Sequence, residues 1–370
     1  MRRLIFSLIA LAGIAFAAGA QDILEMHPEG DVVPRLLTAR KPAVQWGAPK
    51  ASPSWTVLLF SDIHGDCENL GRIVRFRRAY ARYIDAAIHT GDAVYCYFDN
   101  PNPWSMVDGA GELMNAVGNH DCWKGHLLWS QTERPYDATK EDAYGLLLAP
   151  YIAGWDVVQP KGVDKKGNPH YRACYYYKDY PESDIRLIVL DCMHYDQAQH
   201  GWFAETLSDA AGKGLQVVAV QHFPPESGLD SIESGFTERD ETIGPVYNPE
   251  RKQMERMNVE AYDLVDDFID KGGSFVAWMS GHTHQDFIGH VSGHARQFQI
   301  IVDKAGEGDD YMQEDRTRGT VNQDAFDLVT VNTSRHLVII DRIGCTRDQY
   351  MRGKHLLVYD YVNRKVLVNE

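Results

Sequence analysis

The chain has 370 residues, of which 44% are hydrophobic and 24% are charged, and its formal net charge is −15. This composition predicts a globular protein with a sizeable buried core and excludes a wholly disordered chain. The acidic balance argues against general attraction to nucleic acid or anionic membranes, so no nucleic-acid partner is expected.

Residues 1–20 have the pattern of a secretory signal peptide. Arg2 and Arg3 precede an apolar run over residues 4–17, and Ala18-Gly19-Ala20 supplies the small residues of a cleavage site. The apolar run is shorter than the ~20 residues that a membrane-spanning helix needs, and no later stretch is long and apolar enough. We therefore expect an exported chain, periplasmic or secreted, without a transmembrane segment.

Residues 21–54 contain five prolines and no periodic pattern, which predicts an N-terminal extension ahead of a single domain over residues 55–370. The six cysteines of the chain are scattered and include no CxxC pair. Their even number permits disulfides in an oxidising compartment, but in a chain of this length we expect mostly buried free thiols. Nothing in the sequence fixes the oligomeric state.

The domain begins with the apolar run 55–60, which predicts a strand buried on both faces. The run leads into Ser61-Asp62-Ile63-His64-Gly65-Asp66, and a helix follows with Asp66 as its N-cap. The apolar side of this helix is expected to comprise Leu70, Ile73, Val74 and Ile84. Its arginines are expected on a solvated outer face: Arg72, Arg75, Arg77, Arg78 and Arg82.

Two further short strands also end in polar residues. Residues 86–90 lead into Gly91-Asp92, and residues 113–117 lead into Gly118-Asn119-His120-Asp121. Alternation of strand, helix and strand predicts a mostly parallel sheet. In such sheets, ligands bind beyond the carboxyl ends of the strands, which is where these polar groups lie.

An aromatic-rich insertion interrupts this alternation over residues 122–181. Within it, residues 155–159 and 171–177 flank Lys165-Lys166-Gly167-Asn168, a favourable hairpin signal. The insertion follows a polar motif directly. It therefore either borders the site or packs against the sheet, and both interpretations stay open.

The strand and helix signals return after the insertion. Residues 186–191 and 215–220 predict buried strands, with an amphipathic helix over 201–211 between them. The second of these strands ends in Gln221-His222. A long polar loop without clear structure is expected over residues 226–258, and loops of this length are usually lids, substrate loops or mobile segments.

The last part of the domain begins with a helix over 259–271, for which Gly272 is the expected C-cap. The strand at 274–279 then leads into Gly281-His282-Thr283-His284. Because alternate residues of a strand point to the same side, we expect the two histidines to project together. Residues 295–370 predict antiparallel strands that complete a second sheet.

One candidate site collects the polar groups at these strand ends: Asp62, His64, Asp92, Asn119, His120, His222, His282 and His284. Mixed carboxylate, amide and imidazole ligands suit iron, manganese or zinc. Even without His120, the remaining seven groups are too many for one ion, but they suit two ions that share a carboxylate and lie ~3.5–4 Å apart. A water that bridges such ions loses a proton easily and becomes a nucleophile.

The series Asp62-x-His64, Gly91-Asp92, Gly118-Asn119-His120-Asp121, His222 and Gly281-His282-x-His284 resembles the calcineurin-like metallophosphoesterases in order, spacing and strand context. The resemblance covers residues 55 to about 290. It implies an α/β fold, namely a four-layer α-β-β-α sandwich of two mixed sheets, with a dimetal site at the C-terminal ends of the strands. It also implies hydrolysis of a phosphoester by in-line attack of a metal-bridging hydroxide.

The resemblance also assigns roles within the site. It implies that the first ion is held by Asp62, His64, Asp92 and His284. It implies that the second ion is held by Asp92, Asn119, His222 and His282. Asp92 would then be the bridging ligand at the catalytic centre, His120 would protonate the leaving oxygen, and Asp121 would orient a neighbouring group.

The sequence differs from two known groups of related phosphatases. Tyr95 and Cys96 stand where serine/threonine protein phosphatases have aspartate and arginine, which argues against that class. The block Gly91-Asp92-Ala93-Val94-Tyr95 resembles purple acid phosphatases, whose tyrosine binds ferric iron, so a monoesterase that uses Tyr95 is one alternative. That group has glycine where this chain has His64, which disfavours Tyr95 as a ligand.

A second alternative is a non-catalytic protein that binds a glycan or lipid on the same fold.

Possible pocket residues of the candidate site are Tyr95, His126 and His194. The substrate is expected to be a small-molecule, lipid or nucleotide phosphoester. Its identity, the preference for mono- or diesters and the native metals stay open.

Overall fold

The computed structural model describes residues 54–94, 112–122, 155–160, 173–193, 195–225, 229–231, 246–248, 253–255, 259–306, 316, 323–345 and 355–369. The expectations for the signal peptide, the N-terminal extension, Tyr95, Cys96, His126, His194 and most of the insertion lie outside these ranges. Across the described ranges, no helix combines the length and the apolarity that a membrane crossing needs.

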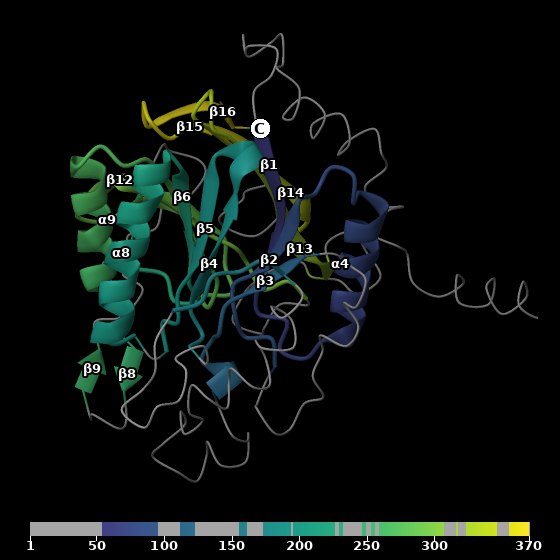
Figure 1. Cartoon of the computed structure of the whole chain (residues 1–370). Helices are drawn as coiled ribbons and strands as arrows, with labels where there is room; N and C mark the ends of the chain where they lie inside the picture. The colour runs from purple at the N-terminus through teal and green to yellow at the C-terminus, as the bar shows by residue number, and fades with distance from the viewer. Residues whose placement is uncertain are drawn as a thin grey trace, which may run out of the picture.

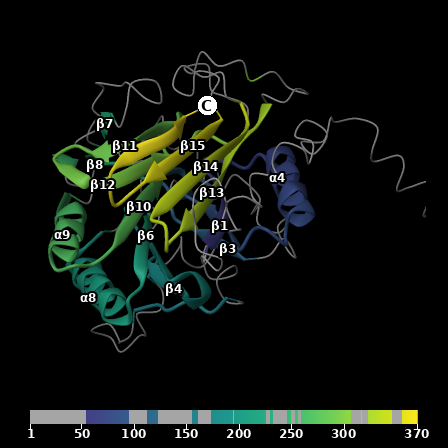
Figure 2. The same cartoon turned by 90° about the horizontal axis from the view of Figure 1, so that it is seen from above.

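Two seven-stranded sheets face each other in the middle of the molecule (Figure 2). In spatial order, the first sheet contains β16 (Lys365–Asn369), β15 (Leu356–Asp360), β14 (Leu337–Gly344), β13 (Ala325–Asn332), β1 (Ser54–Phe60), β2 (Ala86–His89) and β3 (Leu113–Asn115). Strands β1, β2 and β3 are parallel, whereas β13 pairs with β1 in the antiparallel direction. The first sheet is therefore mixed.

The second sheet is also mixed. In spatial order, it contains β4 (Tyr176–Tyr180), β5 (Ile185–Val189), β6 (Gln216–Val220), β10 (Phe275–Ser280), β12 (His294–Ile301), β11 (Phe287–Val291) and β7 (Leu229–Ser231). Its centre, from β5 through β6 and β10 to β12, is parallel, and β4, β11 and β7 are antiparallel to their neighbours.

Helices cover the outer faces of both sheets. Helix α4 (Cys67–Ala79) lies outside the first sheet, and α8 (Gln197–Lys213) and α9 (Val259–Asp270) lie outside the second (Figure 1). The sequence of layers is therefore helix, sheet, sheet and helix, which confirms the expected four-layer α-β-β-α sandwich.

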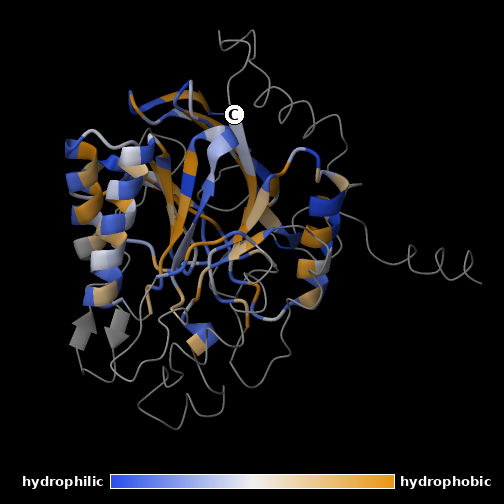
Figure 3. Cartoon of the chain, in the orientation of Figure 1, coloured by the Kyte–Doolittle hydropathy of each residue, from blue (hydrophilic) through white to orange (hydrophobic). Residues whose placement is uncertain are grey.

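The apolar runs form strands because both faces of each sheet are covered. On β1, Val57 and Leu59 face the other sheet, whereas Leu58 and Phe60 pack with the residues of α4. All four side chains are buried. Figure 3 shows hydrophobic residues along the facing strands. A continuous apolar run is thus explained by burial on both faces.

Helix α4 begins as expected, because the Asp66 side chain accepts a hydrogen bond from the Asn69 amide at 2.9 Å. The expected apolar side is correct for Leu70, Ile73 and Val74, which are buried. The helix ends at Ala79, so the buried Ile84 lies beyond it rather than on its face.

The expected solvated arginine face of α4 is only partly present. Arg75 is exposed, but Arg72 and Arg77 are buried. Arg72 makes two hydrogen bonds of 2.7 Å to Asp324, one from Nε to Oδ2 and one from Nη2 to Oδ1. Asp324 precedes β13, 252 residues along the chain. Sequence pattern around α4 cannot reveal a partner so distant.

The C-terminal strands differ from the expectation in two ways. β13 to β16 do not complete a second sheet but extend the first one beside β1. β12, at the start of the segment 295–370, belongs to the other sheet and is parallel to β10. The chain crosses between the sheets after β12, because β13 can pair with the free edge of β1.

The loop over residues 226–258 is more regular than expected. β7 adds to the edge of the second sheet against β11. β8 (Val246–Asn248) and β9 (Gln253–Glu255) form a separate two-stranded ribbon. In the aromatic insertion, the flanks of the expected hairpin do meet, since Val158 and Tyr177 exchange two backbone hydrogen bonds of 2.7 and 3.0 Å.

Five cysteines of the described ranges are free thiols: Cys67, Cys122, Cys174, Cys192 and Cys345. All but Cys67 are buried. This agrees with the expectation of mostly buried free thiols.

The Arg72–Asp324 pair should stabilise the fold. We expect Arg72→Ala to lower the free energy of unfolding by about 3–5 kcal/mol, because it leaves the buried Asp324 carboxylate without its cation. The exposed Arg75→Ala on the same helix is the matched control and should change it little. Chemical denaturation followed by circular dichroism measures both, and equal effects would contradict this role.

Candidate metal centre

The candidate ligands come from parallel strands that end at one edge of the sandwich. Asp62 and His64 follow β1, Asp92 follows β2, and Asn119 follows β3 in the first sheet. In the second sheet, His222 follows β6, and the pair His282 and His284 follows β10. Because strands of each group are parallel neighbours, their loops meet at the same end.

Five of these ligand candidates have a left-handed backbone. Their φ angles are 53° for Asp62, 48° for His64, 58° for Asp92, 73° for His282 and 54° for His284. Non-glycine residues rarely adopt this region, and such strain concentrates at functional sites. The loops are therefore held in place by their contacts rather than by local preference.

This backbone corrects the expected geometry of the final histidine pair. β10 ends at Ser280, so His282 and His284 lie in the following loop and strand alternation does not apply to them. The two imidazoles enter different groups. His284 joins Asp62 and His64, whereas His282 joins Asp92 and His222.

Three glycines of the motifs allow the loops to approach closely. A Cβ atom at Gly118 would lie 2.1 Å from Asp92 Oδ1, and one at Gly281 would lie 1.8 Å from Ser61 Oγ. At Gly91, which has a φ of 122°, a Cβ atom would lie 2.5 Å from the ring of His222. A side chain at any of these positions would push the ligand groups apart.

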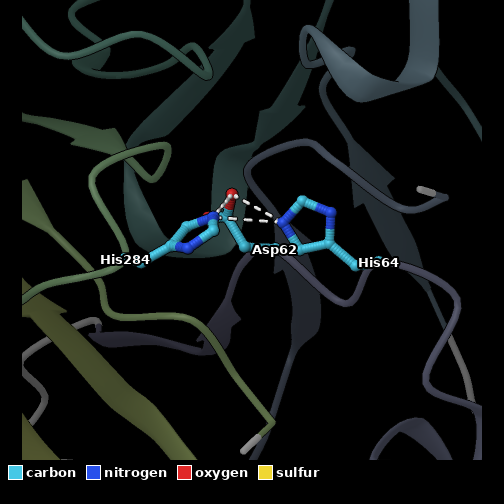
Figure 4. A group of neighbouring side chains, drawn as sticks. All are labelled: Asp62, His64 and His284. Carbon is cyan, nitrogen blue, oxygen red and sulfur yellow. Dashed lines mark hydrogen bonds and ion pairs between the residues drawn. The ribbon is translucent and has the colours of Figure 1, made fainter. Parts of the chain in front are cut away.

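The first group is formed by Asp62, His64 and His284. Figure 4 shows the two imidazoles on opposite sides of the Asp62 carboxylate. Nε2 of His284 lies 3.2 Å from Asp62 Oδ1, and Nε2 of His64 lies 3.7 Å from the same oxygen. The two Nε2 atoms are 3.1 Å apart. One small cation could contact all three groups.

The second group is formed by Asp92, His222 and His282. Nε2 of His222 lies 3.3 Å from Asp92 Oδ2 and 3.0 Å from Asn119 Oδ1. Asp92 also faces the first group, since His64 Nε2 lies 4.0 Å from the same Oδ2 atom. The Asp92 carboxylate therefore stands between the two groups.

The hydrogen bonding of the Asp62 and Asp92 carboxylates indicates whether metal ions fit in the two groups. One oxygen of each is fixed by a backbone amide, because His282 N donates to Asp62 Oδ2 at 3.0 Å and His120 N donates to Asp92 Oδ1 at 2.8 Å. The other oxygens, Asp62 Oδ1 and Asp92 Oδ2, are buried without a hydrogen-bond partner. Both face imidazole nitrogens, so the donor set fits one metal ion in each group.

The charge states suit metal binding. Burial lowers the pKa of both His64 and His282 to about 3, so these imidazoles are neutral and keep a lone pair at neutral pH. Burial opposes ionisation of Asp62, but the adjacent His284 holds the Asp62 pKa well below its usual range. For Asp92, burial is likewise outweighed by the charge of His222, and its pKa is lowered.

The pKa of His222 is also set by burial and by neighbouring charge, but here the charge has the larger effect. Burial lowers its pKa, but the Asp92 carboxylate outweighs burial and raises it to about 9. Its Nδ1 lies 3.1 Å from the carbonyl oxygen of Thr90. A metal ion would displace the proton on Nε2, while the proton kept on Nδ1 would donate to that carbonyl. The Thr90 contact was not foreseen, because a carbonyl group gives no sequence signal.

His120 and Asp121 lie beside the ligand groups. Nε2 of His120 lies 4.0 Å from Asp92 Oδ2, and its ring packs edge-on against His64 with centroids 4.4 Å apart. The buried Asp121 carboxylate accepts three backbone hydrogen bonds, from Asp92, Val94 and Gly118. It thus ties the loop after β2 to the loop after β3.

The structure therefore brings together every expected ligand and both neighbouring residues. Among the histidines without a predicted role, His89 lies buried behind the centre, 2.6 Å from Asn115 Oδ1 through its Nδ1. Phe223 packs edge-on against His282 with ring centroids 4.4 Å apart. A single buried histidine or phenylalanine cannot be distinguished from ordinary core in the sequence.

Comparison with known proteins places this geometry in context. The model of the calcineurin-like phosphoesterase family matches residues 56–286. A search of curated proteins finds no match.

Solved structures are similar at low identity. A dimetal phosphatase from Danio rerio is 12% identical, with a TM-score of 0.49 over 84% of this chain and 99% of that one. The protein TT1561 of Thermus thermophilus is 9% identical, with a TM-score of 0.38 over 85% and 98%. A phosphatase from Mycoplasma pneumoniae is 11% identical, with a TM-score of 0.35 over 86% and 92%.

The family model matches residues 56–286, a range that starts within β1 and includes every ligand loop and the final histidine pair. The match includes each of the groups that converge at the edge of the sandwich. The chain therefore belongs to the calcineurin-like phosphoesterase family.

Proposed function

We propose that this protein hydrolyses a phosphoester with two bound metal ions. The observation that carries the proposal is the pair of buried carboxylate oxygens, Asp62 Oδ1 and Asp92 Oδ2, which face imidazole nitrogens and have no hydrogen-bond partner. Two adjacent groups with this donor set would be electrostatically unfavourable without cations. The membership of the chain in a phosphoesterase family supports the reaction class.

Each ion would have four protein ligands. Asp62, His64, Asp92 and His284 would hold the first ion. Asp92, Asn119, His222 and His282 would hold the second. Iron, manganese and zinc all suit these ligands. When bound, such ions supply Lewis acidity toward the phosphoryl group and a nucleophile at neutral pH.

His120 would act as a proton donor toward the leaving oxygen of the ester. Its imidazole is 14% exposed, whereas the Asp92 carboxylate beside it is 1% exposed. A substrate can thus reach His120 at the edge of the centre. Its backbone amide is fixed by Asp92 Oδ1, which holds the residue in position while its ring contacts the ester. Imidazole suits this role because it can carry a proton near neutral pH.

The alternatives have less support. A purple-acid-phosphatase-like monoesterase would use Tyr95, which lies outside the described residues. His64 stands with Asp62 and His284 and would fill the coordination position that a tyrosine would need. A non-catalytic protein that binds a glycan or lipid is disfavoured by the full set of ligand groups. An exported location, periplasmic or secreted, is proposed from residues 1–20 alone.

Asp92→Asn should abolish hydrolysis and reduce metal content, because an amide removes the negative charge between the two groups. We expect the loss of activity to exceed about 100-fold, since outer partners of metal ligands already account for 10–100-fold. Turnover of p-nitrophenyl phosphate and bis(p-nitrophenyl) phosphate, together with elemental analysis, measures both effects. The exposed Asp267→Asn on α9 is the control, and an active, metal-loaded Asp92→Asn would contradict the proposal.

His120→Ala should separate catalysis from metal binding. We expect turnover to fall by about 10²–10⁴-fold, which is the contribution of a positioned acid or base, with metal content unchanged. His200→Ala, a histidine on α8 outside the centre, serves as the control. If His120→Ala lost its metals along with its activity, His120 would be a ligand instead of a proton donor.

Removal of the metals should also destabilise the folded chain. Chelation leaves the buried Asp62 and Asp92 carboxylates without bound metal ions, so we expect lower activity and a lower melting temperature. Both should return after addition of Mn²⁺, Zn²⁺ or Fe²⁺, and differential scanning calorimetry follows the thermal transition. Full activity in metal-free protein would exclude the two-metal reaction.

A further inference from the structure

A buried ionic group lies between the two sheets, outside the ligand set. Arg342 on β14 and Asp327 on β13 are direct cross-strand partners, and both are 2% exposed. Nε of Arg342 lies 3.1 Å from Asp327 Oδ1. Their neighbours Ile340 and Val329 belong to the core between the sheets, so this pair faces the second sheet across an apolar layer.

Arg342 reaches the second sheet through Asp286. Its Nη2 donates to Asp286 Oδ1, and the backbone amide of Asp303 donates to the same oxygen at 3.0 Å. Asp286 is 1% exposed and lies between His284 and the start of β11. One carboxylate oxygen thus joins the loop after β10, the end of β12 and strand β14.

The loop 281–286, between β10 and β11, carries the two histidine ligands. The Arg342–Asp286 contact fixes its C-terminal end and is called the far anchor here. The near end is fixed by other groups, since Gly281 N donates to His222 O at 3.1 Å and His282 N donates to Asp62 Oδ2 at 3.0 Å. His282 therefore lies directly at the near anchor. His284 lies two residues before Asp286, at the far anchor.

A second arginine, Arg316, supports the same region through a side chain that is 3% exposed. Arg316 donates to Asp303 Oδ2, to the carbonyl of Gly306 at 3.2 Å and to that of Lys304 at 3.2 Å. The segment that it holds runs beside β1, because Ala305 N donates to Ser61 O at 2.9 Å. The Asp303 amide that reaches Asp286 is thus itself held in place.

We propose that Arg342 is a positioning residue for the first metal ion and acts through Asp286 on His284. This inference rests on the proposed two-metal function. Apolar packing between the sheets would stabilise the fold without fixing the orientation of particular groups. A buried arginine with two carboxylates is also costly to desolvate. The directional contacts place Asp286, and with it the left-handed His284, beside Asp62 and His64. The second ion, whose ligand His282 lies at the near anchor, depends less on Arg342.

The test is a calorimetric titration of metal-free full-length protein with Mn²⁺. We expect two binding events in the wild type and, in Arg342→Lys, a loss of about tenfold or more in the affinity of one event, as for outer partners of metal ligands. Asp286→Asn should have the same effect. His284→Ala and His282→Ala identify the two events, and Arg342→Lys should resemble only His284→Ala.

A matched control separates positioning from stability. Arg186 is 0% exposed and pairs with Asp179 and Asp209. It lies at the start of β5, whereas the ligand loops follow the C-terminal ends of their strands. Arg186→Lys should lower the melting temperature but leave both Mn²⁺ affinities unchanged. Equal weakening of both events in Arg342→Lys, or no weakening, would overturn the positioning role. A wild-type protein that binds no Mn²⁺, Zn²⁺ or Fe²⁺ would overturn the two-metal function itself.

Discussion

The structure is arranged around two buried carboxylates, Asp62 and Asp92. Asp62 and Asp92 are almost completely buried, and each has one oxygen fixed by an amide and one oxygen without a hydrogen-bond partner. Isolated buried charges are strongly unfavourable, and the surrounding loops bring imidazole groups to both carboxylates. The left-handed ligand residues, the motif glycines and the three amides bound by Asp121 all serve this arrangement.

Each sheet supplies part of the ligand set. The first sheet supplies both carboxylates, His64 and the amide of Asn119, whereas the second supplies His222 and the final histidine pair. A centre assembled in this way exists only where the sheets are held in register with each other. The apolar layer keeps them together, and directed contacts such as the His282 amide to Asp62 set the distance between the loops. Packing thus provides the stability, and hydrogen bonds provide the geometry.

Much of this arrangement could be predicted from the sequence. The strands before Asp62, Asp92 and His222 were predictable because they are buried on both faces, and the ligand set because its residues follow strand ends. The left-handed backbone was not, since φ angles at His282 and His284 are imposed by long-range contacts. Burial of Arg72 and the sheet to which β13 belongs were not predictable either. Both depend on partners more than 250 residues away.

The position of β13 has a consequence for folding. Its Thr330 hydroxyl meets that of Thr56 on β1 at 2.9 Å, across 274 residues of sequence. The edge of β1 is therefore open until nearly the whole chain is available, although the ligands from Asp62 to His284 precede β13. Such a high contact order favours slow folding, because a large loop must close before the pairing is gained. Shortening the chain before β13 would leave β1 as an exposed edge, which is prone to pair with other chains.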